Sequence, residues 1–313
     1  MEPGLRLGVD LGGTKIEAAV VRLDGGAVEV LARRRVPTEQ HRGYEHIVAA
    51  VVRIIQDTAR QAHLPALPPV GVGMPGSVTQ GAGSSGPLLV KNSNTQCLNG
   101  RPFRDDLQRA LGHPVAFAND ANCFALAEAR CGAGRGCRVV FGVILGTGVG
   151  GGIVLEGRIW EGAQGIAGEW GHVVLDPSGP PCYCGRRGCV ERYLSGPAIE
   201  QAYAARTGVH RPLHEIAARA DDPAARATLA TTTETFGRAL ATVINILDPE
   251  IVVLGGGVSN LPQLYDEGVA AVRRWVFNDR LQTAIVRHQL GDSAGVFGAA
   301  LLPEPALRPP ALS

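Results

Sequence analysis

Residues 5–15, Leu-Arg-Leu-Gly-Val-Asp-Leu-Gly-Gly-Thr-Lys, decide how this chain folds. An apolar run ends at Asp10, a Gly-Gly-Thr turn follows, and residues 15–21 are apolar again, which is typical of a β-hairpin. The pattern returns at residues 138–155, where two apolar runs flank Gly146-Thr147-Gly148. Two copies of one hairpin, each opening a half of the chain, predict a duplicated α/β fold with a cleft between the halves.

Helical periodicity predicts much of the remaining framework, because apolar residues recur every three or four positions in several stretches. Asn119 is suited to cap one of these helices, and Asp248-Pro249 is a stop signal for another. We expect helices at 41–63, 120–130, 224–247, 261–275 and 293–302, a buried strand at 251–254, and a Pro-rich, frayed tail at 303–313.

Composition places the chain among ordinary globular proteins. It has 313 residues, of which 45% are hydrophobic and 19% charged, and a formal net charge of +1. The sequence lacks a Lys/Arg run of the kind that binds nucleic acid, an apolar run of the roughly 18 residues that span a membrane, and a signal-peptide pattern. Seven cysteines, an odd number, fit a reducing compartment better than a disulfide framework. We therefore expect a cytoplasmic protein.

Both Gly/Thr turns are candidate phosphate sites. The backbone N–H groups of Gly12 and Gly13 and the hydroxyl of Thr14 can surround an anion, and Asp10 at the strand end can hold Mg²⁺ through water. Residues 146–151 match G-x-G-x-x-G, but a strand rather than a helix follows them, which excludes the dinucleotide-binding interpretation. The alternative for the first turn is an ordinary glycine hairpin.

A polar pair, Asn119-Asp120, lies where an apolar strand meets a helix. An acid at such a junction exposes its oxygens at the edge of a cleft and can accept a proton from a hydroxyl group. The alternative is that the two residues only cap the helix.

Three of the seven cysteines are crowded together and follow an upstream histidine. The set consists of His172, Cys182, Cys184 and Cys189. Cys3His is a composition of closed structural zinc sites, and thiolate with imidazole selects zinc rather than Mg²⁺. The alternative is a buried or reactive thiol cluster. A metal that fixes this loop also fixes the two carboxylates that flank it, Glu169 and Glu191.

Two further glycine segments have both functional and structural interpretations. Gly255-Gly256-Gly257 ends an apolar strand and offers a flat wall for a planar ring such as adenine, or only a close packing turn. Residues 73–77, with residues 91–94 downstream, carry amides and hydroxyls that suit a polyol ligand, or they form a solvent loop.

Together these motifs resemble the ROK family (repressors, open-reading-frame proteins and sugar kinases), which has an actin/hexokinase-like, ribonuclease H-like duplicated α/β fold. The resemblance runs from Leu5 to about Leu302. Its most specific part extends from GEWGH through CYCGRRGCVE, residues 168–191, and DLGGTK, NDANC, LGTGVGGG and LDPEIVVLGGGVSN match in order. The resemblance implies two lobes with an active-site cleft between them. Residues 1–117 and 290–313 would form the small lobe, and residues 118–289 the large lobe with the zinc segment 168–191.

The resemblance also implies an enzyme that phosphorylates a sugar with ATP and Mg²⁺, stabilised by a structural zinc. Asp120 would be the general base. The residues expected at the sugar are Gly76, Asn94, Asn119, Asp120, Glu169, His172, which is also a zinc ligand, and Glu191. Those expected at ATP and Mg²⁺ are Asp10, Gly12, Gly13, Thr14, Lys15, Gly146, Thr147 and Gly148, with Gly255 and Gly256 along adenosine. A homodimer is implied as well.

The expected substrate is a hexose that is phosphorylated at its 6-hydroxyl. Residues 90–103, GEWGH at 168–172, PCYCG at 181–185 and GDSAGVFGAA at 291–300 look like the bacterial fructokinase/mannokinase branch. N-acetylglucosamine kinase, which shares NDANCFAL and LGTGVGGG, is the first alternative, and glucokinase the next. A non-catalytic sugar sensor or repressor is disfavoured, since the first hairpin begins at Leu5 and leaves no room before it for a DNA-binding module.

Overall fold

The computed structural model describes residues 4–80 and 86–303, so residues 304–313 of the predicted Pro-rich tail lie outside the described part. Packing divides the chain into two compact units. The first unit contains Met1–Gly136, Gly152–Ala167 and Gln289–Ser313, and the second contains Cys137–Gly151 and Gly168–His288. Residues 118–136 thus pack with the N-terminal part of the chain, whereas the sequence assigned them to a large lobe. The lobe boundaries remain a prediction.

The first unit is built on a five-stranded sheet with the strand order β3-β2-β1-β4-β7. β1 (Gly4–Leu11) and β2 (Lys15–Asp24) form the predicted antiparallel hairpin, with Asp10 opposite Glu17. β4 (Val70–Met74) pairs in parallel with β1 and with the edge strand β7 (Val115–Asn119). The remaining elements of this unit are β3 (Ala27–Pro37), α1 (Tyr44–Gln61), β5 (Ser77–Gln80), β6 (Leu88–Lys91), α2 (Phe103–Leu111), α3 (Asp120–Cys131), β10 (Arg158–Ile159) and α9 (Ala294–Leu301), with short 3₁₀ turns at Gln40–Arg42, Gln96–Leu98 and Gly291–Ser293.

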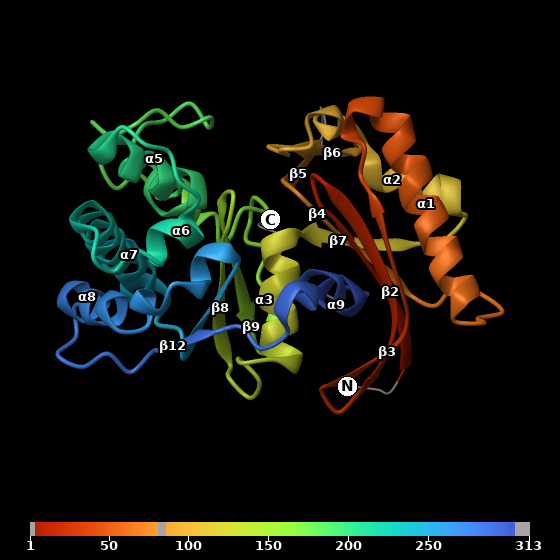
Figure 1. The fold of residues 1–313 in the computed structure, drawn as a ribbon. Helices are drawn as coiled ribbons and strands as arrows, with labels where there is room; N and C mark the ends of the chain where they lie inside the picture. The colour runs from red at the N-terminus through yellow and green to blue at the C-terminus, as the bar shows by residue number, and fades with distance from the viewer. Residues whose placement is uncertain (1–3, 81–85, 304–313) are drawn as a thin grey trace. The chain divides into compact units, whose positions relative to one another are not determined.

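Helices cover both faces of this sheet (Figure 1). On one face α1 buries an apolar stripe that includes Ile47, Val51 and Ile54, the residues whose spacing predicted it. On the other face α9 approaches the strands so closely that a Cβ atom on Gly8 would overlap the carbonyl oxygen of Val296. Glycine at that position therefore sets the depth at which α9 packs.

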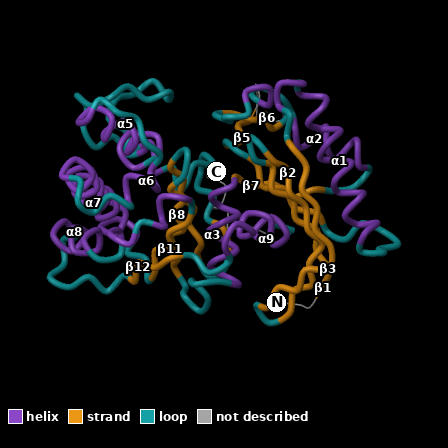
Figure 2. Tube along the Cα trace, viewed as in Figure 1, coloured by secondary structure: helices purple, strands orange, loops and turns teal. Residues whose placement is uncertain are grey.

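The second unit has a sheet in which β9, β8, β11 and β12 are neighbours in that order, and β10 continues it beyond β9. β8 (Val139–Leu145) and β9 (Val149–Leu155) are joined by the tight turn at Gly146–Gly148, which confirms the second predicted hairpin. β11 (Ile251–Gly255) is parallel to β8 and to β12 (Ala284–Arg287). Figure 2 shows helices α5 to α8 beside these strands. The helices of this unit are α4 (Glu191–Leu194), α5 (Gly196–Thr207), α6 (Leu213–Ala217), α7 (Pro223–Leu247) and α8 (Glu267–Trp275), with 3₁₀ turns at Trp170–His172, Gly257–Asn260 and Pro262–Leu264.

The long predicted helix is confirmed as α7, which ends where Asp248 adopts the left-handed conformation ahead of Pro249. The single helix expected at 261–275 is wrong in its first turn, because the chain forms a 3₁₀ turn at Pro262–Leu264 and starts α8 only at Glu267. The hydroxyl of Tyr265 donates a hydrogen bond back to the carbonyl oxygen of Ser259 at 2.8 Å, which ties this junction to the preceding turn. No helix among residues 4–80 and 86–303 is long and apolar enough to cross a membrane.

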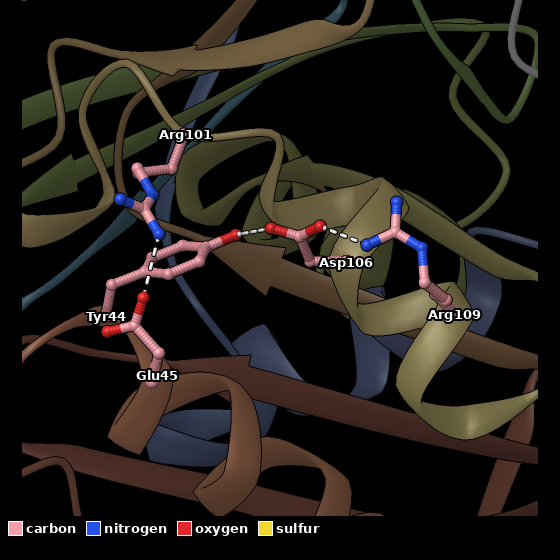
Figure 3. Close-up of polar contacts among 5 residues, drawn as sticks. All are labelled: Tyr44, Glu45, Arg101, Asp106 and Arg109. Atoms are coloured by element: carbon pink, nitrogen blue, oxygen red, sulfur yellow. Dashed lines mark hydrogen bonds and ion pairs between the residues drawn. The ribbon is translucent and has the colours of Figure 1, made fainter.

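A polar cluster joins α1 to the start of α2 (Figure 3). The Tyr44 hydroxyl donates to Asp106 at 2.6 Å, and Arg109 donates to the same carboxylate at 2.7 Å. The hydrogen bond from Tyr44 holds the pKa of Asp106 below its usual range. Arg101 lies over the Tyr44 ring, 4.1 Å from its centroid, and pairs with Glu45 at 2.9 Å. The cluster therefore fixes the segment that leads from β6 to α2.

Candidate active site and metal centre

Two carboxylates stand at the carboxyl ends of the strands in the first unit. Asp10 is near the end of β1, and Asp120 follows β7 directly, with only β4 between the two strands. Burial and the neighbouring Asp120 and Glu17 carboxylates raise the pKa of Asp10 to about 6. Neighbouring carboxylates whose pKa values are raised by desolvation and by nearby negative charge are a feature of functional sites.

The junction between β7 and α3 orients Asn119 and Asp120. Asn119 caps α3, since its side-chain oxygen accepts the N–H of Asn122 at 2.7 Å, so the capping interpretation is confirmed for this residue. Asp120 accepts the N–H of Ala121 at 2.9 Å through one carboxylate oxygen. Its side chain keeps an exposed edge, yet the surrounding protein displaces enough water to raise the pKa of the carboxyl. Such a group suits general-base chemistry near neutral pH.

Two residues that the sequence analysis missed make contacts around Asp10 and α3. A Cβ atom on Gly295, in α9, would lie 2.9 Å from Asp10 Oδ2, so the last helix touches the first strand's carboxylate. Glu128, in α3, is fully buried and accepts the N–H groups of Ala133, Gln289 and Leu290 at 2.9–3.1 Å. These contacts are non-local, and only a carboxylate within an apolar helical stretch signalled Glu128.

The pKa of Asp10 leads to a testable expectation for Asp10→Asn. The pKa of Asp10 rises from 3.8 to about 6 on folding, so between these pH values the folded chain binds more protons than the unfolded chain. The free energy of unfolding therefore falls as the pH rises through this range. Asparagine removes this dependence. Denaturant unfolding should show Asp10→Asn to be more stable than wild type at neutral pH, by up to about 3 kcal/mol, and equal to it below pH 3.8. Equal stability at neutral pH would contradict the assignment.

A cationic cluster surrounds one buried carboxylate beside the first hairpin. Glu17 is 1% exposed and pairs with Arg33 at 2.5 Å, Arg35 at 2.6 Å and Lys15 at 3.8 Å. Lys15, predicted to contact phosphate, therefore already shares a partner with two arginines. Three cations around one anion leave positive charge close to the turn at Thr14, which favours a phosphate ligand there.

The turn of the first hairpin lies next to the predicted sugar loop. The N–H of Gly12 bonds the carbonyl of Lys15 at 2.9 Å, which closes the turn and leaves Thr14 exposed at its tip. Asn94 Oδ1 would be 4.0 Å from a Cβ atom on Gly13, so the structure brings these two predicted site residues together. Gly76 has a φ of 88° and lies against the backbone that precedes Asn94, where a side chain would collide with it.

The second unit joins its hairpin turn to the zinc segment. Glu191, at the start of α4, accepts the N–H of Val149 at 3.0 Å, and a Cβ atom on Gly148 would lie 2.8 Å from the same carboxylate oxygen. Gly146 is closed onto Gly148 by a backbone hydrogen bond of 2.9 Å, and Thr147 is exposed at the tip. A carboxylate predicted at the sugar is thus anchored to the turn predicted at the phosphates.

Residues 168–172 pack against the same strand. The indole N–H of Trp170 donates to the carbonyl of Gly150 at 3.2 Å, and its ring meets Phe141 edge to face. A side chain on Gly171 would collide with the carbonyl of Val149. Glu169, which precedes Trp170, is half-buried. Its position therefore depends on the packing of the whole segment.

The four predicted metal ligands come together. One ligand atom from each of His172, Cys182, Cys184 and Cys189 lies within 4.8 Å of all the others. Cys182 Sγ is 3.7 Å from His172 Nδ1, and Cys184 Sγ is 3.6 Å from Cys189 Sγ. A tetrahedral zinc with Zn–S of about 2.3 Å requires ligand separations of roughly 3.5–3.8 Å. The donor set and its spacing fit zinc, and all seven cysteines are free thiols.

The two ring nitrogens of His172 have different surroundings. Nδ1 faces Cys182, whereas Nε2 lies 3.0 Å from the hydroxyl of Tyr183, whose ring meets the imidazole edge to face. Nδ1 is therefore the nitrogen placed for a metal. Nε2 contacts Tyr183, which is 72% exposed, and the contact of His172 with a sugar hydroxyl stays a prediction.

The glycine wall after β11 has a packing role at one position. Gly256 has a φ of 81°, and a Cβ atom there would overlap the carbonyl of Leu145, whereas Gly257 has open space around it.

We expect Gly256→Ala to lower the free energy of unfolding by about 2 kcal/mol or more, because it combines left-handed strain with a backbone collision. Gly257→Ala is the control and should change stability by under about 1 kcal/mol in a denaturant melt. Equal stability of the two variants would contradict the packing role. The contact of Gly255 and Gly256 with adenosine stays a prediction.

Each sheet contains a hairpin with a glycine/threonine turn, and a carboxylate stands where β7 meets α3, which is the arrangement expected of an ATP-dependent sugar kinase. A model of the ROK family matches residues 6–305, and this chain belongs to that family. This match confirms the predicted family, and together with the relatives and solved structures described next it confirms the predicted fold class and enzyme class.

Relatives of known activity and solved structures agree with this membership. The N-acetyl-D-glucosamine kinase of Photobacterium profundum is 37% identical over 307 residues, which cover 94% of this chain and 98% of the relative. That of Pectobacterium atrosepticum is 34% identical, with 94% and 97% covered. Among structures, the ROK hexokinase from Thermus thermophilus has a TM-score of 0.83 at 34% identity, covering 96% of this chain and 97% of that one. A ROK glucokinase from Streptomyces griseus, solved with glucose and AMPPNP, has a TM-score of 0.78 at 32% identity, covering 96% and 99%.

Proposed function

We propose that this protein is an N-acetylglucosamine kinase that transfers the γ-phosphoryl group of ATP to the sugar 6-hydroxyl. The observation that carries the chemistry is Asp120 at the start of α3, whose raised pKa and hydrogen bond with the N–H of Ala121 suit a general base. The choice of sugar is supported by the curated N-acetylglucosamine kinases at 34–37% identity over 94% of the chain. This ranking reverses the expectation from the sequence, which put fructokinase/mannokinase first.

In the proposed reaction the sugar hydroxyl oxygen forms a bond to the γ-phosphorus. The bond from that phosphorus to the β–γ bridging oxygen breaks, ADP leaves with the electron pair, and Asp120 takes the hydroxyl proton. Phosphoryl transfer depends mostly on positioning and on charge neutralisation. Mg²⁺ bound with ATP supplies part of that neutralisation, and Asp10 is the residue that we expect to hold it.

The remaining roles are assigned within each unit. In the first unit, Asn94 and Asn119 would contact the sugar, while Gly12 to Thr14 would surround phosphate oxygens. In the second unit, Glu169, His172 and Glu191 would hydrogen-bond the sugar hydroxyls, and the turn at Gly146–Gly148 would contact phosphate. A zinc held by the Cys3His set would act as a clamp on those three sugar ligands.

Fructokinase/mannokinase is the second candidate, favoured by the likeness of residues 90–103 and 291–300 to that branch. Steady-state kinetics with ATP and a panel of N-acetylglucosamine, glucose, mannose and fructose separates the two. We expect the highest kcat/KM for N-acetylglucosamine and a 6-phosphate product by NMR. A higher kcat/KM for fructose or mannose would replace the proposal with the second candidate, since the contact to a single substituent can decide between sugars.

A further inference from the structure

A cavity of about 490 Å³ lies within the first unit, beside the edge strand β7. We call it the β7 cavity. Its lining comes from five parts of the unit: Arg104 of α2, the strand β7, Arg130 of α3, Arg158 and Glu161 around β10, and the end of α9. None of these residues has a role in the proposed kinase site. The volume is within the range of small-molecule sites.

The charge of this lining is concentrated. Three arginines against one glutamate give a formal charge of +2 in one cavity, whereas the whole chain carries +1. Arg104 pairs weakly with Asp105, at 3.3 Å, and Arg130 has a further interaction of its own. Arg158 is exposed and has no ion pair among residues 4–80 and 86–303. Arginine is suited to anions because its guanidinium group can donate two parallel hydrogen bonds to carboxylate or phosphate oxygens.

The remaining lining residues of the cavity include apolar side chains. Phe117, Ile159 and Leu301 give the cavity apolar surface that can pack against C–H groups. An anion with a small carbon body therefore fits better than a bare ion.

We propose that the β7 cavity binds a small organic phosphate, of the size and charge of a hexose monophosphate. A phosphate monoester carries about −1.5 to −2 charges at neutral pH, which matches the +2 of the lining. Sugar phosphates are also the product class of a sugar kinase, so a ligand of this chemistry is present wherever the enzyme works. The cavity shares β7 and α3 with Asp120, but binding there does not depend on which sugar the kinase phosphorylates.

Isothermal titration calorimetry with glucose 6-phosphate tests the proposal, with glucose as the uncharged comparison. We expect saturable binding of the phosphate and no binding of glucose to the same site. Arg158→Gln should weaken binding about 10- to 100-fold, because it removes a charge-assisted contact. Arg53→Gln, at an exposed arginine of α1 outside the cavity, is the matched control and should leave binding unchanged.

Three controls separate this site from the kinase site and from non-specific binding. Asp120→Asn and an excess of N-acetylglucosamine with AMPPNP should both leave phosphate binding unchanged. Thermal melts should show Arg158→Gln to be folded, since the side chain is exposed. Absence of saturable binding by wild type, an equal loss in Arg53→Gln, or displacement by N-acetylglucosamine with AMPPNP would each overturn the proposal, whatever the sugar specificity proves to be.

Discussion

Replacement of Asp120 by asparagine is expected to lower kcat by about 10²- to 10⁴-fold while leaving the fold nearly unchanged. Asparagine keeps a side-chain oxygen for the N–H of Ala121, so the first turn of α3 retains its hydrogen bond. It cannot accept the hydroxyl proton as a carboxylate does. The loss should therefore appear in kcat, with the KM for sugar and for ATP changed much less.

Asp24→Asn is the matched control for this experiment, because Asp24 is an exposed aspartate at the end of β2, away from the β7–α3 junction. Its kinetics should equal those of wild type, and melts of both variants should overlay the wild-type curve. An Asp120→Asn enzyme with turnover close to that of wild type would refute the general-base assignment, even if the family and the fold stand.

Replacement of Cys184 by serine is expected to prevent zinc binding and to raise the KM for sugar by more than about tenfold. Changes next to metal ligands cost roughly 10–100-fold, and loss of a ligand should cost more. The KM for ATP should also rise. Glu191 accepts a hydrogen bond from the N–H of Val149, and Trp170 donates one to the carbonyl of Gly150. Disorder in residues 168–191 would break both bonds and free the neighbouring turn at Gly146–Gly148.

Metal analysis of freshly purified protein is the primary measurement, and it does not depend on activity. We expect one zinc per chain in wild type, one in the control Cys137→Ser, and none in Cys184→Ser. Cys137 is a partly buried cysteine of the same unit that lies outside the Cys3His set. Hydrogen exchange should show faster exchange across residues 168–191 in Cys184→Ser. Zinc-free wild-type protein with full activity would refute the proposal that zinc positions the sugar-binding residues.

Local patterns were sufficient wherever a structure depends on neighbours in sequence. The hairpin of β1 and β2, the cap at Asn119 and the end of α7 before Pro249 follow from turn and capping chemistry. The Cys3His set was also readable, because three of its ligands lie within eight positions and the fourth a short way upstream. The break between Pro262 and Glu267 was missed because local periodicity was continuous across it.

The sequence by itself determined the duplicated hairpins, the Cys3His set and the acid at the β7–α3 junction, since each is encoded in a short stretch of residue types. Only the tertiary structure decided what surrounds them. Gly295 reaches Asp10 from the other end of the chain, Glu191 is anchored to the turn after Gly148, and distant segments enclose the β7 cavity. These contacts arise when strands and helices far apart in sequence pack together, and the distance along the chain hides them from any local pattern.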